Sequence, residues 1–139
     1  MDESNATKAQ QIARAASDFE RQRTGHVPKS VTVVVSDDTL VITLRGALSP
    51  AEKAVAKSPE GAAQMQQFHR QLFDSSCHTL RQEIHRITGV EVREATAEVE
   101  TTTGAVMQMF ATGTVVQVFL LARSMPAETW SGSGPGNPS

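Results

Sequence analysis

The chain has 139 residues and a formal net charge of −2, with 13 basic residues against 15 acidic ones. This length predicts one domain, with a hydrophobic core that needs neither disulfides nor metals to hold it. The small net charge excludes a general electrostatic attraction to nucleic acid or anionic lipid. The single cysteine, Cys77, excludes an intrachain disulfide and a cysteine-built zinc site, and it fits a reducing cytosol.

The sequence predicts no membrane-spanning segment. Its start, Met1–Asn5, is acidic and polar and lacks the basic and apolar regions of a signal peptide. The longest apolar run, Val115–Ala122, is interrupted by Gln117 and falls far short of the roughly 20 residues that a spanning helix needs. We therefore expect no direct membrane span, so this chain could not conduct an ion by itself.

The first predicted element is a helix over residues 6–23. Its apolar stripe is thin and mostly alanine: Ala9, Ile12, Ala13, Ala16 and Phe19. Such a helix should dock against the body of the protein or against another subunit. The alternative is a frayed surface helix, because short alanine-rich helices are marginal in water.

A β-hairpin is predicted next. Residues 30–36 form a valine-rich strand, Asp37-Asp38 is a turn, and residues 39–45 alternate between apolar and polar positions. The first of these strands is apolar on both faces, which favours a central place in the sheet and partial cover on its second side.

Two helices follow the hairpin. Ser49 and Glu52 form a capping box with Pro50 between them, which predicts a short helix over residues 50–57. A long amphipathic helix is predicted from Ser58-Pro59-Glu60 to Gly89, because both ends carry capping signals. Its apolar stripe is expected to be Met65, Phe68, Leu72, Leu80, Ile84 and Ile87.

Late strands complete the predicted sheet. Val90–Arg93 starts a strand whose apolar face then shifts to Ala95, Ala97 and Val99, so a bulge is expected near Arg93-Glu94. Turns are predicted at 101–104 and 111–114, and strands at 105–110 and 115–122. The fold class is α+β: a two-layer sandwich of order α-ββ-αα-ββ(β), with a mainly antiparallel sheet covered by one long helix. We expect a single domain over residues 1–124 and a disordered Pro/Gly/Ser-rich tail over 125–139.

Potential catalytic and metal-binding residues are sparse. Asp74, His78 and His85 share one face of the long helix, but one helix supplies too few ligands, so we expect no metal and no cofactor. Cys77 is expected to be a buried structural thiol, since the adjacent His78 points about 100° away on a helix. No catalytic pair is identified, and Glu91, Glu94, Glu98 and Glu100 are expected to form a polar sheet face. Exposed aromatics beside a basic face are missing from the hairpins, which argues against nucleic-acid binding.

The loop before the first strand is a candidate anion site. Gly25, His26, Pro28, Lys29 and Ser30 lie close to Arg21 and Arg23, but the spacing is not that of a phosphate loop. The alternative is an ordinary helix-to-strand turn with solvated basic groups.

Several short segments resemble the MpsC-like family, a domain of unknown function named for a sodium-translocating, membrane-potential-generating system. They are Phe19-Glu20, Gly25, Pro28-Lys29-Ser30-Val31, Asp38–Gly46, Leu48–Lys53, Ala56-Lys57, Glu60-Gly61 and Thr88–Val92. The resemblance covers about residues 6–122. Two departures stand out. The family usually has a second glycine before the proline, where this chain has Val27, which weakens the anion-site idea. The last hairpin is also longer around Gly104–Thr114.

The resemblance implies an accessory cytosolic protein, with no catalytic residues to transfer. In some genomes such proteins are linked to membrane machinery for ion-coupled potential generation or inorganic-carbon uptake. It implies membrane transport proteins or another protein as partners, a homodimer as a further option, and a place in the cytoplasm or at the inner face of the membrane through a partner. The apolar residues of the longer last hairpin, Val106, Met107, Met109 and Phe110, are the candidate contact surface. The competing hypothesis is a soluble sensor that binds a small anion or nucleotide at residues 25–30.

Overall fold

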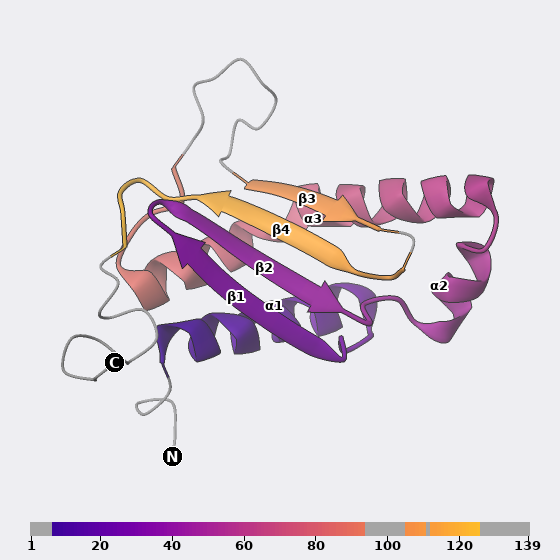
Figure 1. Ribbon diagram of the computed structural model, residues 1–139, viewed down its shortest axis with the longest axis horizontal. Helices are drawn as coiled ribbons and strands as arrows, with labels where there is room; N and C mark the ends of the chain where they lie inside the picture. Colours follow the sequence, from indigo (N-terminus) through magenta and orange to yellow (C-terminus); the bar gives the residue numbers. More distant parts are fainter. Residues whose placement is uncertain (1–6, 94–104, 111, 126–139) are drawn as a thin grey trace.

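The computed structural model describes residues 7–93, 105–110 and 112–125. Helices and strands form two layers, with α1 and α3 on one face of a four-stranded sheet and α2 at one end (Figure 1). The elements in chain order are α1 (Lys8–Thr24), β1 (Ser30–Ser36), β2 (Thr39–Arg45), α2 (Pro50–Val55), α3 (Pro59–Thr88), β3 (Ala105–Met109) and β4 (Val115–Leu120). The α+β prediction is confirmed, with a second helix covering the sheet beside the long one.

The sheet is antiparallel throughout, in the order β1-β2-β4-β3. The predicted hairpin is confirmed, with Ser36 opposite Thr39 across the Asp37-Asp38 turn. The prediction that its first strand is central is wrong, because β1 lies at an edge of the sheet. The central strands are β2 and β4, and Leu40, Ile42 and Leu44 of β2 are fully buried. The inward valines of β1 are only half-buried.

The first helix docks against the body of the protein. Ile12, Ala16 and Phe19 are buried, and α1 packs against both α3 and β1. A capping box from Thr7 and Gln10 starts the helix, and Gly25 ends it in the left-handed conformation with φ of 80°. The thin stripe is therefore enough to place this helix in the core, and the frayed alternative does not hold.

Both long-helix caps are confirmed, but part of its predicted stripe is wrong. Ser58 caps the start of α3 and Gly89 ends it, as expected. Leu80, Ile84 and Ile87 are buried, whereas Phe68 is 45% exposed and Leu72 only half-buried. The buried positions before Leu80 are instead Gly61, His69, Phe73 and Cys77. The apolar pattern misplaced this face because one of its buried side chains is a histidine.

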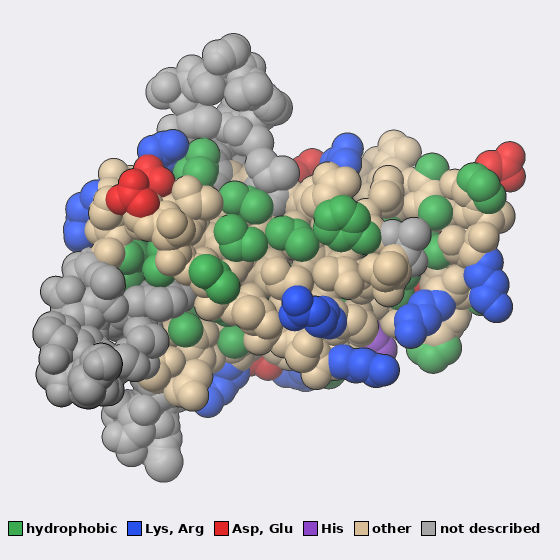
Figure 2. Space-filling model, viewed as in Figure 1, with side chains coloured by type: hydrophobic (Ala, Val, Ile, Leu, Met, Phe, Trp, Pro, Cys, Tyr) green, Lys and Arg blue, Asp and Glu red, His purple; other side chains and the backbone are tan. Residues whose placement is uncertain are grey.

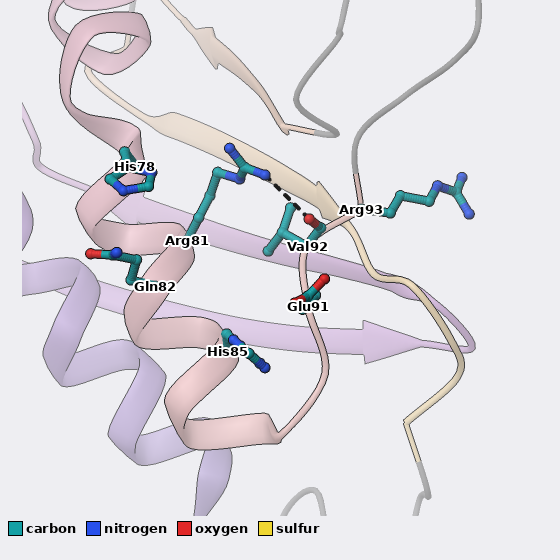
Figure 3. A pocket seen from close by; sticks show the side chains of 7 residues that line it. All are labelled: His78, Arg81, Gln82, His85, Glu91, Val92 and Arg93. Carbon is teal, nitrogen blue, oxygen red and sulfur yellow. Dashed lines mark hydrogen bonds between the residues drawn. The ribbon is translucent and has the colours of Figure 1, made fainter.

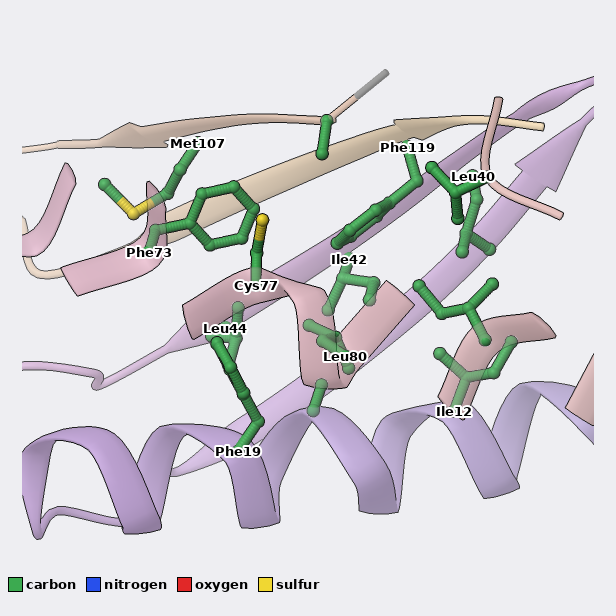
Figure 4. Packing of buried hydrophobic residues seen from close by; sticks show 14 of the residues in the cluster. Ile12, Phe19, Leu40, Ile42, Leu44, Phe73, Cys77, Leu80, Met107 and Phe119 are labelled. Carbon is green, nitrogen blue, oxygen red and sulfur yellow. The ribbon is translucent and has the colours of Figure 1, made fainter. Parts of the chain in front are cut away.

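The core gathers aromatic side chains from three elements. Phe73 of α3 packs edge-on against Phe19 of α1, with ring centroids 6.5 Å apart, and its centroid lies 6.1 Å from that of Phe119 on β4 (Figure 4). Such pairs contribute beyond the area that they bury. Cys77 is buried beside them as a free thiol, as predicted, and burial raises its pKa.

The segment after α3 forms less sheet than predicted. Val92 makes a single antiparallel bridge with Leu121 instead of starting a strand. Residues 94–104 lie outside the described residues, and with them the expected second half of the bulge, the alanine-valine face and the turn at 101–104. The predicted tail from 126 also lies outside them. The helix over 50–57 is shorter than expected and ends at Val55. Among the described helices, none is long and apolar enough to cross a membrane.

Candidate functional site

The predicted anion loop is a packed connection between α1 and β1. The His26 ring Nε2 lies 3.0 Å from the Gly46 carbonyl oxygen, and Pro28 is buried. The Lys29 backbone N–H donates to the Arg45 carbonyl at 2.8 Å. The stem of Lys29 lies close against Gly46, within 2.7 Å of where a Cβ would stand, so this close approach requires glycine. Gly25, Lys29 and Ser30 are exposed.

The neighbouring basic residues do not join this loop. Arg21 pairs with Asp18 at 3.5 Å, and the Arg23 side chain is buried against Glu20. Of the residues predicted to bind an anion, Lys29 is the one that brings an exposed positive charge to the loop. Anion binding at residues 25–30 stays a prediction. A thermal-shift screen with nucleotides, bicarbonate and phosphate would test it, since a ligand at a hundredfold excess over its Kd adds about 2.7 kcal/mol of stability.

A buried polar network ties three helices together. Arg23 and Glu20 of α1 form an ion pair whose side chains are 3% and 0% exposed. The Arg23 guanidinium also donates to the His69 carbonyl of α3 at 3.4 Å. The His69 ring, fully buried, lies 3.0 Å from the Glu52 carboxylate of α2. This chain of contacts links α1 to α3 and α3 to α2.

Glu52 is the carboxylate that links α2 to this network. Burial raises the pKa of the carboxyl group, but the hydrogen bond from the Ser49 N–H and the hydrogen bond and charge of His69 outweigh it. The net effect holds the pKa of Glu52 below its ordinary value. One of its oxygens accepts from Ser49 at 2.9 Å, completing the predicted capping box, and the other meets His69. Glu52 therefore joins a local cap to a long-range contact.

The network positions α2 against α3. No residue of α2 is buried, so its polar link to His69 supplies a fixed contact with α3 that apolar packing does not. Sequence reasoning identified the capping role of Glu52 but missed its bond to His69. Burial of Glu20, Arg23 and His69 was also missed, because hydropathy gives no signal for polar side chains that pair inside a core.

An open hollow of about 430 Å³ lies beside the last turns of α3 (Figure 3). Arg81 donates to the Val92 carbonyl at 3.2 Å, while Arg93 points away toward Asp38 at 3.4 Å. The hollow is lined by His78, Arg81, Gln82, His85, Glu91, Val92 and Arg93. Within the described parts of the chain, no group of three or more His, Cys, Asp or Glu side chains is placed to hold a metal.

Most of the predicted contact surface on the last hairpin faces inward. Met107 and Met109 are 4% and 2% exposed and belong to the core, which withdraws them from any partner. Phe110 is 46% exposed just beyond the end of β3. The side chain of Val106 lies outside the described residues. The hairpin thus extends the sheet, and Phe110 is the member of the predicted set that the structure places at the surface.

The sheet face opposite α1 and α3 is turned toward the viewer in Figures 1 and 2, and hydrophobic side chains lie across it. Three valines form a row across it, because Val34 is opposite Val41 and Val41 is opposite Val118. Val34 is 53% exposed, and the other two are half-buried. We call this the open face; its described residues are Thr32, Val34, Thr39, Val41, Thr43, Arg45, Gln108, Val116, Val118 and Leu120.

Comparison with known proteins gives the family. A family model described as "Na+-translocating membrane potential-generating system (MpsC)" matches residues 4–121. The chain belongs to the MpsC family. It is also similar to "Uncharacterized protein YbcI" of Bacillus subtilis (strain 168), with 27% identity over 110 residues that cover 79% of this chain and 89% of that protein. No solved structure matches. For this MpsC chain, the resemblance read from the hairpin and the Leu48–Lys53 segment is therefore confirmed.

Proposed function

We propose that this chain is a non-enzymatic accessory protein that acts through protein–protein contacts. The system it serves would be a Na+-translocating, membrane-potential-generating system or an inorganic-carbon uptake system. The family description supports the link to such a system. In this proposal, membrane transport proteins carry the ion, and the chain works in the cytoplasm or at the inner face of the membrane by binding them.

The observation that carries the proposal is the open face. A two-layer α+β domain buries one side of its sheet, and the other side is normally polar where it faces water. Here, β2 and β4 present Val41, Val116, Val118 and Leu120 on that side. Apolar side chains in a flat, rigid array form a surface suited to another protein, because each adds area without the entropy cost of ordering a loop.

The chemistry of the described residues points the same way. The buried titratable groups are paired within the helix network, and the free thiol of Cys77 is buried with a raised pKa that keeps it protonated. These groups hold the fold together, while the accessible features include a sheet face and open hollows. Such surfaces suit recognition.

The test is co-purification from native membranes with a matched pair of variants. Val118→Arg places a charge in the middle of the open face, whereas Val55→Arg changes a 44% exposed valine on α2. The wild-type chain and Val55→Arg should recover membrane transport components, and Val118→Arg should lose them. Recovery of soluble, unrelated proteins alone by the wild type would contradict the accessory function. Retention of membrane components by Val118→Arg would exclude the open face as the contact surface.

A further inference from the structure

The edge strand β1 has hydrogen-bonding capacity that the described residues leave unused. It pairs with β2 over all seven residues, from Ser30 opposite Arg45 to Ser36 opposite Thr39, and with no other described strand. A strand at the edge of a sheet presents its remaining N–H and C=O groups outward, where another strand can pair with them. In Figure 1, this edge borders the sheet on the side away from β3.

The β1 sequence lacks the residues that usually protect an edge strand. Natural edges are blocked by lysine, other charges, proline, bulges, short length or a covering helix or loop. α1 packs against β1, but the strand itself has none of the other features. The β1 sequence, Ser-Val-Thr-Val-Val-Val-Ser, contains no charge and no proline, and its pairing with β2 runs without interruption. Its helix-side face is apolar, with Val31, Val33 and Val35 half-buried, and its other face exposes Val34 among serines and a threonine. This composition is that of a strand with neighbours on both sides.

We propose that β1 pairs antiparallel with β1 of a second copy of this chain, about a two-fold axis at Val33. In this register, Ser30 lies opposite Ser36 of the second copy, and Thr32 lies opposite Val34 of the second copy. Two four-stranded sheets would then join into one eight-stranded sheet, with the α1 and α3 helices of both copies on the same face. β1 would become central, which accounts for the exposed Val34 on one face and the half-buried valines on the other.

Charges at the two ends of β1 select a second copy as the partner. The strand begins beside Lys29, which is exposed and whose ammonium contacts no carboxylate among the described residues. It ends at Asp37, which is also exposed and whose carboxylate accepts a hydrogen bond from the Ser124 hydroxyl and contacts no cation among the described residues. Antiparallel pairing about Val33 places Lys29 opposite Asp37 of the second copy, and by symmetry this happens twice. A parallel arrangement would instead set Lys29 beside Lys29 and Asp37 beside Asp37.

The symmetry of this contact is also favourable. A two-fold interface needs a patch that is complementary to itself, and an antiparallel strand pair satisfies that condition through its backbone alone. Shifting the pairing by two residues in either direction keeps the faces aligned but shortens the overlap and separates Lys29 from Asp37. Full overlap and charge pairing therefore choose the same register.

The first test is the oligomeric state of the purified chain, by sedimentation equilibrium at micromolar concentrations. The wild type should be a dimer. Val34→Lys puts two like charges next to the axis on an exposed site, and it should weaken the dimer at least about tenfold. Val55→Lys, the same change on α2, should leave it unchanged. A monomeric wild type, or a dimer that Val34→Lys does not weaken, would overturn the proposal.

A second variant pair tests the charges. Lys29→Glu places an acid opposite Asp37 of the second copy and should weaken the dimer several-fold at low salt, an effect that falls as salt is added. Lys53→Glu makes the same charge change on the exposed surface of α2 and serves as the control. Equal effects of the two substitutions on the dimer would exclude the proposed pairing of Lys29 with Asp37 of the second copy.

The register itself can be read by cross-linking. Chains carrying Thr32→Cys, mixed with chains carrying Val34→Cys, should form a disulfide under mild oxidation, because directly opposed residues lie within disulfide reach. Thr32→Cys mixed with Ser36→Cys should not, since those positions are offset in the proposed register. Cross-linking in the second mixture and not in the first would overturn the register. This proposal concerns the purified chain, so its failure would leave the membrane-system function standing.

Discussion

The two halves of α3 are fastened to the rest of the protein by different chemistry. The C-terminal half buries Leu80, Ile84 and Ile87 in an apolar core shared with α1 and the sheet. The N-terminal half buries His69, which contacts α2 through Glu52 and α1 through Arg23. An apolar core tolerates exchange of one hydrophobic residue for another as long as the total side-chain volume is kept. A buried polar contact depends on each partner being present, because its loss leaves the other group without compensation.

The largest effect is expected where the two halves meet. Phe73→Ala removes a ring that contacts both Phe19 and Phe119, and it should lower the free energy of unfolding by about 4 kcal/mol, through lost burial and the cavity left behind. Chemical denaturation would measure it. The control is Phe68→Ala, five residues earlier on the same helix and 45% exposed, which should cost less than about 1 kcal/mol. Similar losses in both variants would mean that the packing described for Phe73 is wrong.

The next effect tests the polar half. Glu20→Gln keeps the size of a fully buried side chain and one acceptor oxygen, but leaves the Arg23 guanidinium without a counter-charge. We expect a loss of about 3 kcal/mol, the lower end for breaking a buried ion pair. The paired variant Glu20→Leu with Arg23→Met should recover much of that loss, since replacing both members with apolar groups removes the uncompensated charge. Additive losses in the double variant would show that the two side chains do not form one unit.

The same contrast explains how far the sequence could predict the structure. Helix ends and the hairpin were predictable because their signals are local: Ser49 and Glu52, Ser58 and Pro59, and the glycine at 89 each act within one turn of the chain. The apolar half of α3 was also predictable from its period. Burial of His69 and Glu20 was not predictable. The partner of His69, Glu52, lies 17 residues away in the sequence. The pair of Glu20 and Arg23 has the same spacing as an ion pair on a solvated helix face.

Strand order and surface assignment were less predictable still. The apolar faces of β1 indicated a central strand, and the single chain places it at the edge. The sequence pattern of a strand shows how apolar its faces are, but it does not show which strand lies next to it in the sheet. Likewise, Met107 and Met109 were expected at a contact surface because they lie in a late, lengthened hairpin, and alternation along β3 turns both toward the core. The open face was missed because its residues come from strands far apart in the sequence.

The smallest of the three effects concerns Glu52, and it has a defined pH dependence. The folded pKa of Glu52 lies below its ordinary value of 4.5, so folding favours the carboxylate. The resulting stability is fully present above the unfolded pKa and is lost as pH falls through the lower folded pKa. Glu52→Gln should therefore cost about 1.5 kcal/mol near neutral pH, as expected for a hydrogen bond to a charged group, and little in strong acid.

Denaturation of Glu52→Gln and the wild type at several pH values would measure this difference, with Asp74→Asn, an exposed site on α3, as the control. Because Glu52 fastens only α2, the loss should be local. The buried thiol of Cys77 in the apolar core should stay as slow to react with a thiol reagent as in the wild type under native conditions. Fast labelling of Cys77 in Glu52→Gln would show that the polar and apolar halves of α3 open together and that the division drawn between them does not hold. The expected result is that Cys77 is labelled at the wild-type rate and that the stability difference between Glu52→Gln and the wild type shrinks in acid. It would show that the Glu52–His69 contact holds α2 and can be lost without opening the core.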